Sequence, residues 1–349
     1  MIHEGQTANA LYWLVEQNNE FRQWEGMAME VLVLAPFEER HMVEIRQAAG
    51  KDAVVKQIEY DRKKVFDVAV EEALATAEVV IGEPEPRLLK KAPNLKFIQM
   101  TWAGSDLYTN WIQFPEDVSV ANVAGSAYGP IVSQYVVGQI LAITQNLAFY
   151  SRQQMTHKWD DIGPVKTLEG AKVVIFGAGD IGSQVAKKLR AFDVGTIVGV
   201  CRDVAKKREH FDKLVTLSQA EGQIVDADII VCCMPSTKNT ARYFNKRRFE
   251  RVKEGAVLVN VGRGDFIDID ALYMALSDGT LRGAALDVTN PEPLPISHRL
   301  WNNPYCVITP HIAGKSFGHD AGTEDRICKV CCENLRRYIA GESLTHQVI

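Results

Sequence analysis

Short runs of β-branched and other apolar residues alternate along the chain with amphipathic stretches, and this alternation begins near residue 30. The apolar runs are typical of buried strands, and the stretches between them have the periodicity of helices. Strands that are joined by helices in this way lie parallel in a sheet covered on both faces. In the first part of the chain, the pattern predicts strands at 30–36, 54–60, 77–82, 96–101 and 118–123, with helices at 37–49, 64–75 and 86–92.

A second series of strands and helices follows a long helical pattern over residues 130–157 and a break at Gly163-Pro164. A helix is predicted at 183–191, and the last predicted helix covers 319–340. The predicted strands of this series are 171–176, 196–201, 229–233, 256–261, 283–287 and 306–309. We therefore expect an α/β protein with two doubly wound parallel-sheet domains.

The length and composition of the chain agree with two α/β domains and argue against some classes of function. A chain of 349 residues favours two domains over one. Hydrophobic residues make up 46% and charged residues 24%, as in ordinary globular proteins. The formal net charge of −5 argues against a broad basic surface for nucleic acid, and no apolar stretch is long enough to span a membrane. A small-molecule ligand is therefore the better expectation.

Residues 1–28 form an N-terminal extension in front of the first predicted strand. Aromatic residues are interspersed among polar ones, so this stretch is either one amphipathic helix or a segment that precedes a later natural start at Met27 or Met29. It lacks the basic and apolar regions of a signal peptide. The seven cysteines are an odd number with two adjacent pairs, which fits reduced thiols and predicts a cytoplasmic protein.

Three of these cysteines, Cys328, Cys331 and Cys332, fall within the last predicted helix. No further ligand group stands near them at metal-binding spacing. We therefore expect these thiols to pack in the interior, and we predict no metal site.

A glycine fingerprint marks the second series of elements. Gly177, Gly179 and Gly182 follow the predicted strand 171–176 and open the predicted helix 183–191. Glycines at this spacing permit a tight turn, a close approach of the backbone to a pyrophosphate, and close packing of helix on strand. The helix N-terminus then offers its unpaired N–H groups to the phosphates. The motif predicts a Rossmann domain that binds a dinucleotide.

The end of the next predicted strand bears on the identity of the dinucleotide. An acidic residue normally stands there to bind the ribose hydroxyls, but this chain has Cys201, followed by Arg202. Arginine suits a ribose 2′-phosphate, so we predict NADP(H) in preference to NAD(H). The alternative is that the basic run 206–208 is a solvated helix face and that Asp203 binds the ribose.

Three later strands are each followed by a residue suited to acid–base chemistry or anion binding. These residues are Arg263, in a turn with two glycines, Glu292, between two prolines, and His311, in the sequence Thr-Pro-His. In open α/β sheets, ligands bind at the carboxyl ends of the strands. Arginine, glutamate and histidine at that edge are able to bind a carboxylate and to transfer a proton beside a nicotinamide.

From about residue 30 to its C-terminus, the chain resembles the D-isomer-specific 2-hydroxyacid dehydrogenase family, which includes glyoxylate/hydroxypyruvate reductases. The order and spacing of the glycine fingerprint, the Arg263 loop, the Asp287–Pro293 segment and the Thr-Pro-His motif all agree with the family. The resemblance implies a Rossmann cofactor domain inserted into a flavodoxin-like substrate domain. It implies residues 29–125 plus 316–349 for the substrate domain and 126–315 for the dinucleotide-binding domain.

The resemblance also implies roles for individual residues. Arg263 matches the arginine that pairs with the substrate carboxylate and carbonyl oxygen. His311 matches the general acid that protonates the carbonyl oxygen as hydride arrives, and Glu292 matches the acid that orients this imidazole and favours its protonated form. Residues 99–106 match the loop whose backbone amides, at Ala103 and Gly104, hold the substrate carboxylate.

Cofactor contacts carried over from the family extend beyond the fingerprint glycines. With Arg202, Arg263 and His311, the matching positions are Asp180, Ile181, Pro235, Val261, Gly262, Asp287 and Gly314.

Four aromatic residues either line the substrate pocket or pack elsewhere: Trp102, Tyr128, Trp301 and Phe317. In the resembling family the region of the predicted helix 130–157 forms a two-fold interface, so we expect a homodimer. Its apolar positions Ile131, Tyr135, Ile140 and Phe149 either make that contact or pack internally.

The sequence thus favours an oxidoreductase that transfers a hydride between NAD(P)H and C2 of a small 2-oxoacid. Glutamate rather than glutamine at position 292 argues against the related formate dehydrogenases, whose substrate has no carbonyl oxygen to protonate. The alternative is a dinucleotide-sensing binding protein, similar to the co-repressors of the same family, which retain the catalytic residues. The absence of long disordered flanks favours the enzyme, and the sequence leaves the identity of the 2-oxoacid open.

Overall fold

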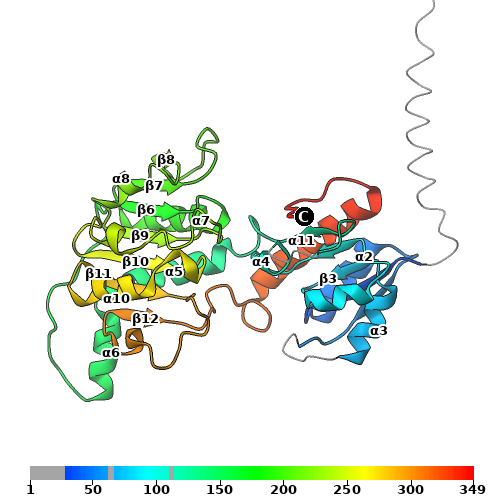
Figure 1. Cartoon of the computed structure of the whole chain (residues 1–349), viewed down its shortest axis with the longest axis horizontal. Coiled ribbons are helices and arrows are strands. Elements are labelled where there is room, and N and C mark those ends of the chain that lie inside the picture. Colours follow the sequence, from blue (N-terminus) through cyan, green and yellow to red (C-terminus); the bar gives the residue numbers. More distant parts are fainter. Residues whose placement is uncertain (1–27, 62–66, 110–113) are drawn as a thin grey trace, which may run out of the picture.

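The computed structural model of the chain describes residues 28–61, 67–109 and 114–349. All but the last residue of the predicted N-terminal extension, together with its possible helix, lies outside the described residues. Figure 1 shows two lobes side by side, each built on its own sheet. No helix among the described residues is both long enough and apolar enough to cross a membrane.

The first lobe contains a five-stranded parallel sheet in the order β2-β1-β3-β4-β5. This is the flavodoxin-like order, in which the chain reverses direction beside the first strand. The strands are β1 (Glu30–Val33), β2 (Val54–Gln57), β3 (Val79–Ile81), β4 (Phe97–Gln99) and β5 (Ser119–Ala121), and the helical segments are α2 (Glu39–Ala49), α3 (Val68–Thr76), η1 (Pro86–Lys91) and α4 (Asp106–Thr109).

The second lobe contains a seven-stranded parallel sheet in the order β12-β11-β10-β9-β6-β7-β8. Counted from β6, this is the Rossmann order with one further strand. The strands are β6 (Val173–Phe176), β7 (Ile197–Val200), β8 (Lys213–Val215), β9 (Ile229–Cys232), β10 (Ala256–Asn260), β11 (Leu281–Leu286) and β12 (Cys306–Ile308). Its helical segments after β6 are α7 (Asp180–Leu189), η2 (Arg190–Phe192), α8 (Glu221–Ile224), α9 (Lys246–Phe249), η3 (Gly264–Phe266), α10 (Ile269–Ser277) and η4 (Arg299–Asn302). The last helix of the chain is α11 (Ala321–Ala340), which packs on the first lobe.

Alternate residues of each central strand enter different cores. In β1, Val31 and Val33 join the cluster beneath α2 and α11, while Leu32 joins the cluster beneath α3. In β6, Val173 lies on the side of α7, while Val174 packs with the phenylalanines of the opposite face. Because both faces are covered, these strands are apolar along their whole length, which is why they stand out in the sequence.

The two lobes are joined by α5 (Gly129–Thr144) and by the segment that leads from β12 to α11. α5 packs on α7 and on the second sheet. α11 packs on α2 and β4 of the first lobe. The C-terminal residues then run antiparallel to β5, where the Val120 amide donates to the Ile349 carbonyl at 3.0 Å. The C-terminal part of the chain therefore packs on the first lobe.

The structure corrects several of the predicted elements. The helix predicted over 130–157 is two helices, α5 and α6 (Leu147–Met155), because Asn146 adopts a left-handed conformation with φ of 58°. The strand β8 was not predicted, because it is a short edge strand that begins with an exposed lysine. The basic run 206–208 belongs to a loop and not to a helix. The predicted helix 86–92 is a 3₁₀ helix, and α7 begins three residues earlier than predicted.

Candidate active site

The glycine fingerprint has the geometry that its spacing predicts. Gly177 has φ of +104°, a conformation that side chains disfavour. A Cβ atom at Gly182 would lie 1.9 Å from the Gly177 carbonyl oxygen, so α7 approaches the strand as closely as only glycine allows. A Cβ atom at Gly179 would meet no atom of the described chain within 4 Å. The turn therefore leaves open space at the N-terminus of α7, and these residues fit a dinucleotide pyrophosphate.

Asp180 and Ile181 stand in the first turn of α7, at the cofactor edge. The Asp180 carboxylate accepts a hydrogen bond from the Gly129 amide of α5 at 2.8 Å. Burial raises the pKa of Asp180, and the bond from Gly129 partly offsets this effect. The side chain of Asp180 thus ties α7 to α5, which leaves its backbone N–H as the group suited to a phosphate.

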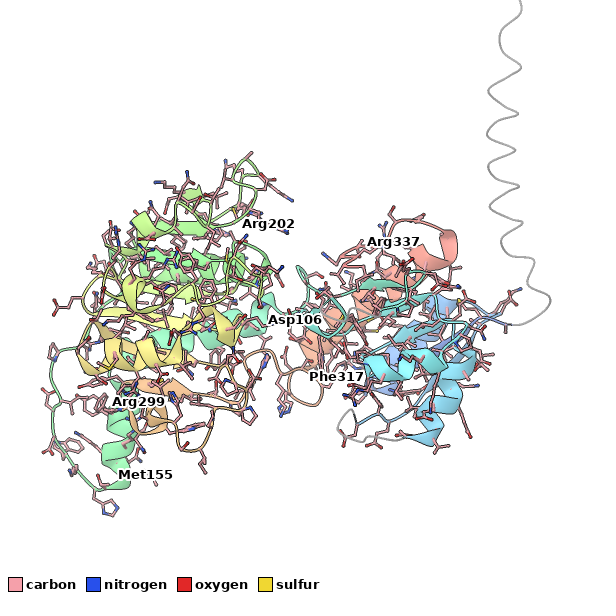
Figure 2. All side chains as sticks on the ribbon, in the orientation of Figure 1. Asp106, Met155, Arg202, Arg299, Phe317 and Arg337 are labelled. Carbon is pink, nitrogen blue, oxygen red and sulfur yellow. The ribbon has the colours of Figure 1, made fainter. Side chains whose placement is uncertain are left out.

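The residues after β7 are arranged around a buried thiol. Cys201 is 8% exposed, and its Sγ donates to the Asp203 carbonyl at 3.3 Å. The Asp203 Oδ1 accepts from the amides of Ala205 at 3.1 Å and Lys206 at 3.3 Å, so it caps its own loop. Arg202 is exposed beside them, and Figure 2 labels it. The carboxylate that would favour the ribose hydroxyls therefore accepts bonds from its own loop, whereas the guanidinium is exposed.

His311 and Glu292 come together at the ends of β12 and β11. The Nδ1 atom of His311 lies 2.7 Å from Oε1 of Glu292, and both side chains are about half exposed. The other ring nitrogen, Nε2, has no partner among the described residues. This arrangement holds the imidazole by one nitrogen and leaves the other for a ligand, as an acid–base catalyst requires.

The backbone of His311 is held in an uncommon conformation. Its φ is 54°, in the left-handed region that few residues other than glycine adopt. Asp287, only 2% exposed, fixes this turn by accepting from the Thr309 hydroxyl at 2.6 Å and from the amides of Ile312 at 2.9 Å and Ala313 at 2.8 Å. The Asp287 carbonyl also accepts from the His311 amide at 2.9 Å. Asp287 therefore positions the imidazole, in addition to the cofactor contact implied by its place in the motif.

A tyrosine of the predicted helix 130–157, expected either at a subunit contact or in internal packing, extends this network. The Tyr135 hydroxyl of α5 lies 2.6 Å from the Thr309 hydroxyl, which itself donates to Asp287. Burial raises the pKa of Tyr135 to about 12, so the phenol stays protonated at neutral pH. The hydroxyl of Tyr135 thus makes a contact within its own lobe.

Arg263 reaches from the second lobe to the first. Its Nε and Nη2 both lie 2.7 Å from Oδ2 of Asp106 in α4, and its Nη1 donates to its own Gly262 carbonyl at 2.8 Å. Figure 2 shows Asp106 between the two lobes. A Cβ atom at Gly104 would lie 1.8 Å from Nη2 of Arg263, so the guanidinium rests directly on the loop predicted to bind the substrate carboxylate.

Glycines bring the remaining loops of the second lobe together. A Cβ atom at Gly262 would lie 2.6 Å from the Met234 carbonyl, which places the 261–263 turn against the Met234-Pro235 loop. A Cβ atom at Gly264 would lie 2.0 Å from the Thr289 backbone. Val261 continues the ladder by donating to the Cys232 carbonyl at 3.0 Å, and Gly314 packs on the ring of Tyr128. All predicted cofactor positions after β9, β10 and β11 therefore share one edge of the sheet.

The four candidate aromatic residues of the pocket divide into two kinds. Tyr128 is buried, with its hydroxyl on the Thr101 carbonyl at 2.9 Å, and Phe317 packs edge-on against Phe37 with ring centroids 5.1 Å apart. Trp102 and Trp301 are 42% and 48% exposed. Of the four, these two indoles are the most exposed.

The three cysteines of the last helix are buried, as predicted, between α11 and α2. The Sγ atoms of Cys328 and Cys332 lie 3.9 Å apart. Contrary to the sequence reasoning, another potential ligand group is nearby, because α2 brings Glu44 Oε2 to 4.0 Å from Cys328 Sγ. Burial and the neighbouring thiol raise the pKa of Cys328, which fits a packed, protonated group.

Comparison with known proteins gives a consistent result. A family model described as "D-isomer specific 2-hydroxyacid dehydrogenase, NAD binding domain" matches residues 137–313. The chain is 30% identical over 274 residues to a glyoxylate reductase of Thermofilum pendens, covering 74% of this chain and 76% of that protein.

Two solved structures are similar over nearly the whole chain. A D-isomer specific 2-hydroxyacid dehydrogenase family protein of Aeromonas salmonicida is 30% identical, with a TM-score of 0.80 over 92% of this chain and 99% of that one. A D-isomer specific 2-hydroxyacid dehydrogenase of Xanthobacter autotrophicus, solved with NADPH and MES, is 24% identical, with a TM-score of 0.76 over 93% of this chain and 98% of that one.

Proposed function

Because the chain belongs to the D-isomer specific 2-hydroxyacid dehydrogenase family, we propose that it reduces a small 2-oxoacid with NADPH and that His311 is the general acid. The protein is an NAD(P)-dependent oxidoreductase of the 2-hydroxyacid dehydrogenase class. The observation that carries the catalytic proposal is the 2.7 Å contact of His311 Nδ1 with Glu292 Oε1, at the strand ends where ligands bind in such sheets.

In this proposal, the His311–Glu292 pair supplies the proton. Glu292 holds Nδ1, so Nε2 faces the reacting carbonyl oxygen and donates its proton in the direction of reduction. The carboxylate keeps the ring oriented before and after that transfer. In oxidation the same nitrogen accepts the proton from the hydroxyl group.

The Arg263 guanidinium binds the substrate carboxylate together with the amides of Ala103 and Gly104. Arg263 already rests on Gly104, and it retains N–H groups beyond those that Asp106 and Gly262 engage. The bound nicotinamide supplies the hydride. The amides and the guanidinium fix the 2-oxoacid by its carboxylate, so that its carbonyl carbon and oxygen are oriented before reaction.

NADPH is the preferred cofactor in this proposal, because positive charge follows β7 where an acid would repel the 2′-phosphate. Arg202 supplies the guanidinium, while Asp203 accepts bonds from its own loop. One charge-assisted contact of this kind contributes about 1.5–3 kcal/mol. The fold also accommodates NADPH in the Xanthobacter protein.

The test is a panel of 2-oxoacids, including glyoxylate and hydroxypyruvate, assayed with NADPH and with NADH. We expect turnover with NADPH favoured in kcat/KM, and about a 10- to 150-fold loss of NADPH efficiency in Arg202→Ala with little change for NADH. A preference for NADH in the parent would overturn the cofactor proposal. Cofactor binding without turnover of any 2-oxoacid would favour the dinucleotide-sensing alternative.

In this proposal each lobe binds a different ligand, and two copies of the protein form a homodimer. Residues 29–125 with 316–349 hold the substrate loop, and residues 126–315 hold the cofactor. A homodimer is supported by the exposed apolar side chains on and after α6: Leu147 (51%), Met155 (83%) and Trp159 (99%). Ile140 is buried inside the lobe, and the ring of Phe149 packs on that of Tyr305. Light scattering that gives a monomer at micromolar concentration would contradict the dimer.

A further inference from the structure

Glu83 is a buried carboxylate behind the loop 101–104. It follows β3 and is only 7% exposed. Its Oε1 accepts from the amides of Thr101 at 2.6 Å and Trp102 at 3.0 Å, and the Thr101 hydroxyl lies within 3.2 Å of both carboxylate oxygens. Removing a carboxylate from water is costly unless donors replace the lost hydration, and two backbone amides and a hydroxyl of this loop are such donors.

The carbonyl oxygens of residues 101–103 are held from another direction. They accept, in chain order, from the Tyr128 hydroxyl at 2.9 Å, the Val123 amide at 3.4 Å and the Asn122 side-chain amide at 2.8 Å. Burial raises the pKa of Tyr128 to about 12, so this phenol remains a donor at neutral pH. Each of the three carbonyls is therefore held by a hydrogen bond from another part of the chain.

The next two backbone donors of the loop are the amides of Ala103 and Gly104. Neither has an acceptor within the part of the chain that the structure describes. Arg263 lies directly against Gly104, with Nη2 1.8 Å from where a Cβ would stand. Two successive backbone donors beside a guanidinium form a site for one carboxylate, provided that the loop is held in this orientation.

We propose that Glu83 is a positioning residue for the substrate carboxylate: it binds the first two amides of the loop so that the next two face the substrate. This inference rests on the proposed function and extends it to a residue that does not touch the substrate. The contribution comes from the acceptor oxygen and not from the charge, because a single oxygen, Oε1, receives both amides.

The test compares Glu83→Ala with Glu83→Gln. In Glu83→Ala both amides lose their acceptor, and we expect KM for the 2-oxoacid to rise about 10- to 100-fold, with a much smaller change in kcat and in NADPH binding. Glu83→Gln keeps an oxygen at the same place and should restore KM to within about threefold of the parent. The matched control is Glu71→Ala, which removes a carboxylate paired with Lys91 elsewhere in the lobe and should change neither value.

A second substitution protects the test against misfolding of Glu83→Ala. Asn122→Ala releases the Ala103 carbonyl from the other side, and a selective rise in KM supports the same loop mechanism. An unchanged KM in Glu83→Ala, or in Asn122→Ala should the former not fold, overturns the role of Glu83. So does an equal loss in Glu83→Gln and Glu83→Ala.

Binding of oxalate to the NADPH-bound protein, measured by calorimetry, distinguishes this inference from the proposed function. Oxalate binding requires the loop but no turnover. If the parent binds oxalate and Glu83→Ala does not, the role of Glu83 stands even when no 2-oxoacid is reduced. If the parent reduces 2-oxoacids and both proteins bind oxalate equally, Glu83 has no such role and the proposed function is unaffected.

Discussion

The two ends of the seven-stranded sheet are built for different purposes. At the amino ends, Asp228 lies between three strands, and its carboxylate accepts from Lys166 Nζ and Lys253 Nζ, each at 2.7 Å, and from the Lys172 amide at 3.0 Å. At the carboxyl ends, His311 and Glu292 are half exposed, and Arg263 turns outward to the other lobe. At the amino ends the Asp228 carboxylate accepts three hydrogen bonds within the protein, whereas the carboxyl ends keep N–H groups for a ligand.

This difference teaches where stability and chemistry are located in the second lobe. Burial alone raises the pKa of Asp228, but the bonds from Lys166, Lys253 and the Lys172 amide outweigh it and lower the pKa to about 2. At the opposite end, the open turn at Gly179 and the left-handed His311 give up local stability for access. We therefore expect substitutions at the two ends to separate activity from folding.

The largest effect is expected for His311→Ala. Loss of the general acid should lower kcat by about 10²- to 10⁴-fold, while NADPH binding and the melting temperature change little. Steady-state kinetics and fluorescence titration of the cofactor measure the two effects. Retention of kcat within a few-fold would remove His311 from the proposed chemistry.

Arg263→Ala should follow, with kcat/KM reduced by roughly 10²- to 10³-fold, because the guanidinium binds the carboxylate both before and during reaction. Asp106→Asn is the informative comparison, because it keeps the shape of the partner and removes its charge. We expect a smaller loss there, mainly in KM. If Arg263→Ala affected kcat alone, ground-state binding of the carboxylate would have to lie elsewhere.

Glu292→Gln should lower kcat by about 10-fold and leave NADPH binding unchanged. The amide still reaches Nδ1 of His311 but brings no negative charge to it, so it orients the ring less strongly. Steady-state kinetics of parent and variant measure the loss. Equal kcat values for the two proteins would count against this role.

The smallest change in activity is expected for Asp228→Asn, whose effect should appear in folding. Its lowered pKa corresponds to about 2 kcal/mol of folding free energy. Because the folded value lies below the unfolded value of 3.8, this stabilisation is present above about pH 4 and is lost as the pH falls toward 2. Urea unfolding of parent and Asp228→Asn at pH 7 and pH 3 measures it. Asp226→Asn, at an exposed ion pair with Lys172, is the control and should change little.

Most of the fold could be predicted from the sequence because its strands are buried on both faces. The apolar runs around Val31, Val173 and Val257 have no solvent-facing side, so they differ clearly from the helices between them. The elements that were missed or predicted wrongly have weak local sequence patterns. β8 is a short edge strand, and the break at Asn146 depends on one residue in a left-handed conformation that many sequences of similar polarity do not adopt.

The residues of the candidate site also differ in whether a local sequence pattern marks them. Arg263, Glu292 and His311 follow strands in motifs with fixed spacing, so the sequence was enough to single them out. Glu83, Asp106 and Tyr135 act across long distances in the chain: Asp106 meets a residue 157 positions away, and Tyr135 one 174 positions away. No local pattern predicts such contacts. The only signal at Glu83 was an acid between glycine and proline directly after a buried strand.

The loop after β7 has a consequence for how readily this enzyme can be redesigned. Only its first residue, Cys201, is buried, and residues 202–207 are exposed and belong to no strand or helix. Its charge is therefore free to vary without repacking the sheet, so cofactor choice is open to evolutionary drift and to engineering. Arg202→Asp, at an exposed position of this loop, should redirect the enzyme toward NADH while its active-site chemistry stays intact.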